Sequence, residues 1–175
     1  MLYLAILLMA LAAFLFWQAS RKRQAAGLPG GRIIYSDTRS WGPAEEPLFD
    51  PEAGLTGRPD YLIHQGEEVI PVEVKSGRHS GGPYDSHIFQ LAAYCWLVEK
   101  SFGRRPAYGV LHYAEGGGRG RTFAIDYSPQ LEAALLELLE EMRSQERRKN
   151  VHRSHDNPAR CRGCGFRSIC DQRLQ

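Results

Sequence analysis

The chain has 175 residues, of which 43% are hydrophobic and 24% charged, and its formal net charge is +2. The segment from Met1 to Ser20 contains no charged side chain, so all 22 basic and 20 acidic residues lie in the remainder. That remainder has the size of one soluble domain and buries one core, which excludes a multi-domain enzyme, a multi-span transporter and a disordered tail protein.

The charge is distributed unevenly along the chain. From Arg143 to the C-terminus there are nine Lys or Arg residues and three acids, whereas the preceding part is net negative. A cationic C-terminal segment suits a polyanion such as nucleic acid, and a solvated basic face is the alternative interpretation.

The first predicted element is an apolar helix. The run from Leu2 to Trp17 spans roughly 24 Å as a helix, and residues 18–20 extend it toward the roughly 30 Å of a bilayer core. Positive charge follows this run at residues 21–23, whereas a signal peptide carries it in front. By the positive-inside rule, we expect residues 1–20 to be a single-pass anchor in the cell membrane with the following domain in the cytoplasm. A signal peptide and a buried helix are the alternatives, and residues 21–31 form a linker.

Strands and helices alternate over residues 32–150. Short apolar runs between turn residues predict strands, and apolar residues spaced three and four apart predict helices. The order predicts an α/β layered domain. The expected strands are Arg32–Ser36, Arg58–His64, Glu68–Lys75, Tyr108–Tyr113 and Thr122–Tyr127; one helix is capped by Ser86 and ends at Gly103, and another starts at Ser128. The apolar stripe of the first helix consists of Ile88, Leu91, Ala92, Cys95, Val98 and Phe102, and the apolar face of the second includes Leu131, Leu135, Leu138, Leu139 and Met142.

Acidic and basic side chains gather on the second and third strands. Glu73 and Lys75 are two apart and therefore share one face of a strand, and the hairpin brings Asp60 toward Glu73. Converging carboxylates with a backbone carbonyl, here that of Val74, suit Mg2+ or Mn2+. Such a cation neutralises a scissile phosphate and lowers the pKa of a bound water, and the Lys75 ammonium stabilises the growing charge. The alternative is a turn aspartate and an ion pair on a solvated strand.

Four segments carry a resemblance to a known family: GLTGRPDYL, IPVEVKSG, QLAAYCWLVE and CRGCGFRSIC. Together they resemble the PD-(D/E)xK superfamily of RecB-like nucleases, most closely its CRISPR-associated Cas-four exonuclease branch. The resemblance implies a restriction-endonuclease-like mixed central sheet flanked by helices. It also implies metal ligation by Asp60, Glu73 and Val74, and catalysis by Asp60, Glu73 and Lys75. Gln90 and Tyr94 are four apart on one helix face, and the resemblance places them beside the catalytic centre in contact with DNA.

A C-terminal tail, residues 151–175, contains three cysteines. Cys161, Cys164 and Cys170 lie close together in a basic segment, and in a reducing compartment this spacing favours metal ligation. The resemblance implies a [4Fe-4S] cluster, and Zn2+ is the alternative. The fourth ligand stays open between Cys95, His152, His155 and a non-protein group. Cys95 lies on the apolar stripe of its helix, which favours a buried core thiol.

The upstream active-site ligand of the family also stays open. Asp37, Glu45, Glu46 and Asp50 are the candidates, and His79 and His87 flank the glycine-rich turn after Lys75.

The sequence thus predicts a membrane-anchored, Mg2+ or Mn2+ dependent deoxyribonuclease that acts on single-stranded ends. It would work in CRISPR adaptation, with adaptation proteins as partners, or alone in DNA repair or defence. The alternative is a non-catalytic, membrane-tethered DNA-binding or scaffold protein that retains the fold.

Overall fold

A computed structural model of the chain describes residues 9, 32–33, 41–76, 81–114 and 120–175. The predicted anchor, apart from Met9, and the predicted linker lie outside these residues. No helix within the described part is long and apolar enough to cross a membrane.

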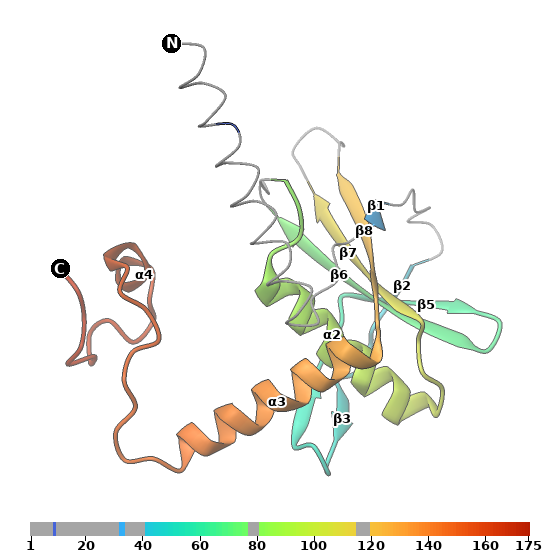
Figure 1. The fold of residues 1–175 in the computed structure, drawn as a ribbon. Coiled ribbons are helices and arrows are strands. Elements are labelled where there is room, and N and C mark those ends of the chain that lie inside the picture. The colour runs from blue at the N-terminus through green and yellow to red at the C-terminus, as the bar shows by residue number, and fades with distance from the viewer. Residues whose placement is uncertain (1–8, 10–31, 34–40, 77–80, 115–119) are drawn as a thin grey trace. The chain divides into compact units, whose positions relative to one another are not determined.

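A six-stranded sheet forms the centre of the fold (Figure 1). Its strand order is β1-β8-β7-β6-β5-β2, with a parallel pair at β6 and β7 and antiparallel neighbours elsewhere. Two further strands, β3 and β4, pair as a separate small sheet. The strands are β1 (Arg32–Ile33), β2 (Gly42–Pro43), β3 (Leu48–Asp50), β4 (Leu55–Gly57), β5 (Tyr61–Gln65), β6 (Glu68–Ser76), β7 (Tyr108–Ala114) and β8 (Arg121–Asp126), and the helices are α2 (Asp85–Phe102), α3 (Pro129–Glu146) and α4 (Pro158–Arg162).

The predicted hairpin is confirmed as β5 and β6. Tyr61 pairs with Val72 and Gln65 with Glu68, and the turn between them contains Gly66 at a φ of 61°. A left-handed φ favours glycine, so the turn fixes the register of the two strands. That register sets Asp60, just before β5, next to Glu73 on β6.

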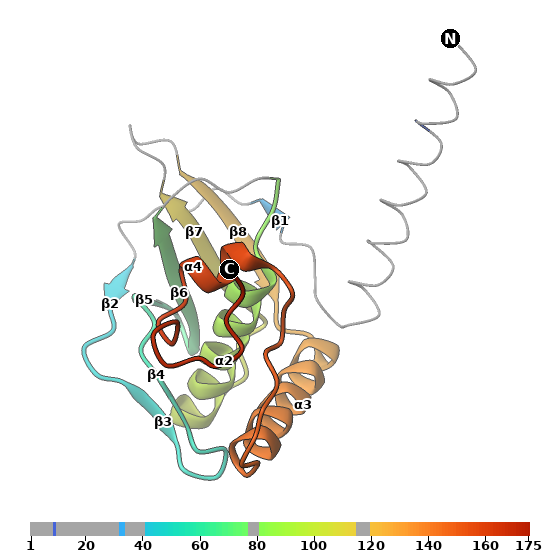
Figure 2. The ribbon, with the colours of Figure 1, turned by 90° about the vertical axis from the view of Figure 1, so that its left-hand side faces the viewer.

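Helix α2 connects the two parallel strands and packs against both of them and against the β3–β4 sheet. Figure 2 shows it across one face of the sheet. Its predicted apolar stripe is buried except for Phe102, which is 45% exposed at the last residue of the helix. Gly103 ends the helix as predicted, with a φ of 71° and its N–H donated to the carbonyl of Glu99. The helix starts one residue before Ser86, after an extended Tyr84 that provides no side-chain cap.

The opposite face of the sheet has its own hydrophobic cluster. Ile63, Ile70, Val72 and Val110 are buried there, and Trp41, Tyr61 and Tyr108 pack against them. Strand β6 is therefore covered on both faces, and its residues 69–73 are all buried.

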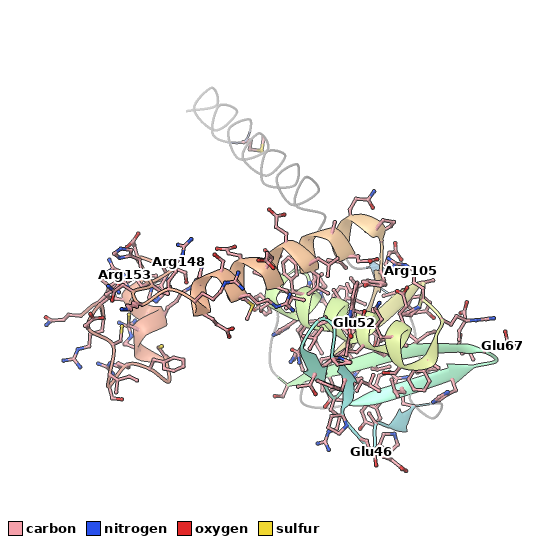
Figure 3. The ribbon with its side chains drawn as sticks, turned by 90° about the horizontal axis from the view of Figure 1, so that it is seen from below. Glu46, Glu52, Glu67, Arg105, Arg148 and Arg153 are labelled. Atoms are coloured by element: carbon pink, nitrogen blue, oxygen red, sulfur yellow. The ribbon has the colours of Figure 1, made fainter. Side chains whose placement is uncertain are left out.

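The last long helix begins where the sequence predicts. The Ser128 hydroxyl accepts a hydrogen bond from the N–H of Leu131 at 3.2 Å, which is a side-chain cap of α3. Arg105 ties its first turn to α2, because the guanidinium pairs with both Glu99 and Glu132 (Figure 3). The chain divides into two compact units, Met1–Glu137 and Leu138–Gln175, so the division falls within α3.

Candidate active site

Strand β6 presents the predicted acid and base on its α2 side. Lys75 Nζ lies 2.7 Å from Glu73 Oε1 and donates a hydrogen bond to it, so the two side chains share one face as expected. Glu73 is buried, with 5% of its surface exposed, whereas the side chain of Lys75 keeps 24%. The ammonium therefore reaches solvent while the carboxylate lies at the base of the site.

Asp60 joins this pair from the start of the hairpin. Its Oδ2 accepts a hydrogen bond from the backbone N–H of Val74 at 2.7 Å, which fixes the carboxylate beside β6. The predicted convergence of Asp60 on Glu73 is thus present, and it depends on the register of two adjacent strands rather than on a distant contact.

Gln90 on α2 completes the group of polar side chains. Its Oε1 accepts from Lys75 Nζ at 2.8 Å, while its Nε2 donates to Glu73 Oε1 at 2.9 Å and to Tyr94 Oη at 2.8 Å. One amide therefore holds the carboxylate and the ammonium in fixed positions. Gln90 thus lies beside Glu73 and Lys75, where the sequence predicted it, and the contact of Gln90 and Tyr94 with DNA stays a prediction.

Tyr94 is buried, with 8% of its surface exposed, and belongs to the core instead of the rim of the helix. Burial raises the pKa of its phenol. It fits because Gly57 on β4 has no side chain: a Cβ there would lie 2.7 Å from Tyr94 Cε1 and 3.2 Å from Leu97 Cδ1. In the sequence, the close packing of Tyr94 on β4 is indicated only by a glycine three residues before Asp60.

The electrostatics of Glu73 suit a bound cation. Burial raises the pKa of the Glu73 carboxyl, the Lys75 hydrogen bond lowers it, and the nearby Asp60 charge raises it again. Two carboxylates in mutual repulsion, with oxygen atoms beyond those used by Lys75 and Val74, form a donor set that fits Mg2+ or Mn2+. Asp60 and Glu73 would hold the ion, which would supply charge neutralisation at a phosphate and a water of lowered pKa.

The additional upstream ligand is not found among the described residues, where no group of three or more His, Cys, Asp or Glu side chains could hold a metal ion. Asp37 lies outside the described part, and Glu45 and Glu46 are exposed, with Glu46 at the outer edge of the domain (Figure 3). The carboxylate of Asp50 is buried and forms a hydrogen bond to a side chain outside the site. Its Oδ2 accepts from the indole N–H of Trp96 at 2.7 Å, a hydrogen bond that is the main cause of its lowered pKa.

Comparison with known proteins assigns this site to a family. The PD-(D/E)XK nuclease superfamily matches residues 6–171, which include the Asp60, Glu73 and Lys75 cluster. The chain belongs to this superfamily. The predicted mixed sheet with flanking helices is thus confirmed as the nuclease fold, and nucleases of the superfamily generally use Mg2+ or Mn2+.

Individual relatives of this PD-(D/E)XK chain include the CRISPR-associated exonuclease Cas4 of Thermoproteus tenax, which is 28% identical over 117 residues. The match covers 66% of this chain and 59% of the relative, so the chain spans less than two thirds of that exonuclease. Among solved structures, the crystal structure of SSO0001 is similar to this chain, with a TM-score of 0.50 and 21% sequence identity. The match covers 94% of this chain and 71% of the SSO0001 chain. At this identity the structural likeness supports the fold alone.

The cysteine tail of this PD-(D/E)XK protein brings one thiol and one imidazole together. Cys161 Sγ lies 4.0 Å from His155 Nε2 and accepts a hydrogen bond from the N–H of Leu174 at 3.4 Å. His155 Nδ1 is buried without a hydrogen-bond partner within the described residues. Cys164 is exposed and Cys170 half-buried. Thiols and an imidazole are ligands that a tetrahedral metal uses, but in the described tail only Cys161 and His155 lie within contact, and no three of these side chains are grouped to hold an ion.

Two hydrogen-bonded segments enclose these cysteines. The backbone N–H of Arg153 donates to Gln172 Oε1 at 2.9 Å, and Gln172 Nε2 donates back to the carbonyl of Val151 at 3.1 Å. These reciprocal bonds, here called the Arg153–Gln172 clasp, join the two ends of the tail. Beside them, Arg167, Arg173 and Cys164 line a hollow of about 750 Å³.

Cys95 is fully buried on α2, as its place in the apolar stripe predicts. Burial raises the pKa of its thiol strongly, so the thiolate that a metal requires is disfavoured.

Proposed function

We propose that this protein is a divalent-metal-dependent deoxyribonuclease that degrades DNA from single-stranded ends. The observation that carries the proposal is the connected group of Asp60, Glu73, Lys75 and Gln90 on two strands and one helix. The Thermoproteus tenax relative is named an exonuclease, which supports the preference for ends.

The residues of this chain have distinct parts in hydrolysis. Asp60 and Glu73, with the carbonyl of Val74, would hold the cation, which would supply charge neutralisation at a scissile phosphate beside β6. Lys75 places its ammonium at the solvent side of Glu73, where one of its three protons is free of the two hydrogen bonds described and stabilises charge on the phosphate. The hydrogen bond from Lys75 to Gln90 holds the ammonium in place when the cleaved phosphate is released.

The test is cleavage of labelled DNA in Mn2+ by the full chain and by Asp60→Ala, Glu73→Ala and Lys75→Ala. Each variant should lose at least about 100-fold in rate, the usual effect of removing a catalytic acid, base or charge. Glu67→Ala is the control, because Glu67 lies exposed at the tip of the β5–β6 hairpin (Figure 3). Parent-like cleavage by the three variants would contradict the assignment.

The substrate arm uses linear and circular single strands and a linear duplex. A nuclease that needs single-stranded ends degrades only the linear single strand. If the parent binds DNA but cuts none of these three substrates in Mn2+, the protein is the non-catalytic DNA-binding scaffold instead.

We further propose that the tail binds a metal through Cys161, Cys164, Cys170 and His155. The contact of Cys161 with His155 and the unpaired Nδ1 favour this histidine over the exposed His152. A [4Fe-4S] cluster is our first choice on the family resemblance, and Zn2+ is the alternative. Protein purified without oxygen should be brown and contain iron; stoichiometric zinc without visible absorbance would exclude the cluster.

Cobalt(II) titration of the metal-free protein tests the fourth ligand directly. His155→Ala should weaken Co2+ binding at least as much as the roughly 10–100-fold that follows loss of a ligand's hydrogen-bond partner. His155→Cys should keep the affinity but shift the d–d absorption, since four sulfurs replace three sulfurs and a nitrogen. His152→Ala is the matched control, and an unchanged His155→Ala titration would remove His155 from the site.

The cellular setting is also a proposal. We propose that residues 1–20 anchor the protein in the cell membrane with the nuclease domain in the cytoplasm, and that it serves CRISPR adaptation with adaptation proteins, or acts alone in repair or defence. Membrane fractionation of cells that express the chain with and without residues 1–20 tests the anchor, and a soluble full-length protein would contradict it.

A further inference from the structure

His87, which follows the glycine-rich turn after Lys75 in the sequence, is part of a helix. It lies in the first turn of α2, three residues before Gln90 and seven before Tyr94, and these spacings place it on the helix face that carries the site. Its side chain is half-buried.

Tyr113 holds the imidazole of His87 from the neighbouring strand. The Tyr113 hydroxyl lies 2.8 Å from His87 Nδ1 and accepts a hydrogen bond from the backbone N–H of Tyr84 at 3.3 Å. The Tyr113 oxygen accepts from this amide and shares a second hydrogen bond with His87 Nδ1. In the tautomer that carries the imidazole proton on Nε2, the phenol donates to Nδ1.

The charge state of His87 is consistent with this tautomer. Burial lowers the pKa of the imidazole, and the positive charge of Lys75 lowers it further. The neutral ring has one donor, and with Nδ1 accepting from Tyr113 that donor is Nε2–H.

The sheet places this donor beside the proposed catalytic group. Tyr113 pairs with Lys75 in the parallel register of β6 and β7, and Lys75 is in turn bonded to Gln90 one helical turn after His87. His87 thus extends the site along α2, on the side of the ammonium. A neutral N–H donor next to an ammonium suits an anionic oxygen.

We propose that His87 Nε2–H donates a hydrogen bond to a non-bridging oxygen of a phosphate in the bound DNA strand, and that Tyr113 positions the imidazole for this contact. This inference rests on the proposed nuclease function for the identity of the ligand. It adds a DNA-binding residue to the cation-binding and catalytic residues already described.

The test measures binding separately from cleavage. Fluorescence anisotropy of a labelled single strand in metal-free buffer should show His87→Ala binding about tenfold more weakly, the usual effect of losing a hydrogen bond to a charged group. His87→Gln should restore most of the affinity, because its side-chain amide also presents an N–H at the end of the chain. If His87→Ala binds as tightly as the parent, the proposal is wrong.

A neutral methylphosphonate placed at successive linkages identifies the phosphate. When the methylphosphonate replaces the contacted phosphate, the parent and His87→Ala should bind the modified strand with equal affinity. At every other linkage the parent should still bind more tightly, and a difference in affinity at all linkages would contradict a single phosphate contact.

The role of Tyr113 is tested through the imidazole 15N chemical shifts of His87, which report the tautomer. Tyr113→Phe should change the parent's Nε2–H form to a mixture and weaken binding, and unchanged shifts would overturn its positioning role.

The two proposals fail in different ways. A parent that cuts no DNA in Mn2+ but shows the His87 effect in anisotropy refutes the nuclease and keeps the phosphate contact. A parent that cuts DNA while His87→Ala binds and cuts equally well refutes only the contact. Urea unfolding of each variant confirms that it is folded before binding is compared.

Discussion

Substitution of Gly57 by alanine should destabilise the domain and disturb the site through Tyr94. The new Cβ would lie 2.7 Å from Tyr94 Cε1, whereas carbon atoms pack at about 3.5–4.0 Å, so the ring must move by about 1 Å. A shift of that size stretches the 2.8 Å hydrogen bond from Gln90 beyond hydrogen-bonding distance. Overpacking costs about 1–3 kcal/mol and the lost hydrogen bond about 1 kcal/mol, which predicts a loss of about 2–4 kcal/mol.

Urea unfolding followed by circular dichroism measures this change in the free energy of unfolding. Gly82→Ala is the matched control, because a Cβ at Gly82 meets no atom within 4 Å. Adding Tyr94→Leu should reduce the cost of Gly57→Ala by about 1 kcal/mol or more, since it removes the ring atoms that the Cβ meets. If Gly57→Ala unfolds at the same urea concentration as Gly82→Ala, the close approach of α2 to β4 is wrong.

Two further predictions concern single side chains. Asp50→Asn should lower the free energy of unfolding at neutral pH. The pKa of Asp50 in the folded state lies below its ordinary 3.8, so the ionised carboxylate stabilises the fold above about pH 4. This stabilisation is lost as the pH falls through the folded pKa, and the variant lacks it at every pH. The urea midpoints of parent and variant should therefore converge as the pH falls below 3.8 and through the lowered pKa of Asp50, and a constant gap would contradict the Trp96 contact. In metal-free protein, iodoacetamide should alkylate Cys164 rapidly and Cys95 only after unfolding, as followed by mass spectrometry. Rapid labelling of Cys95 in the native state would contradict its burial.

Local patterns predicted the β5–β6 hairpin well. The hairpin register follows from alternating side chains and a turn glycine, and this alone brings Asp60 to Glu73. The i,i+4 spacing likewise predicted that Gln90 and Tyr94 share one helix face, where the structure shows a hydrogen bond between them. These relations involve neighbours in sequence or on adjacent strands, which periodicity and turn chemistry encode.

Long-range partners were not predictable in the same way. Strands β2, β3 and β4 are two or three residues long and lie in or beside the Pro-, Gly- and acid-rich stretch Trp41–Leu55, where no strand is predicted from the sequence. Such short strands carry too few alternations to register as a pattern. Trp96 donates a hydrogen bond to Asp50, which lies 46 residues earlier in the chain, and Tyr113 is hydrogen-bonded to the imidazole of His87. Both contacts depend on how α2 packs on the sheets.

The Arg153–Gln172 clasp has a thermodynamic consequence for the tail. The hydrogen bonds of the clasp close the chain between Val151 and Gln172 into a loop, and closing a loop costs chain entropy. If the tail binds the proposed metal, the clasp would bear part of this entropy loss, and ordering Cys164 and Cys170 around Cys161 would restrict the remaining local torsions. Arg153, eight residues before Cys161 in the sequence, would thereby influence how tightly the metal is held, through chain entropy and without touching it.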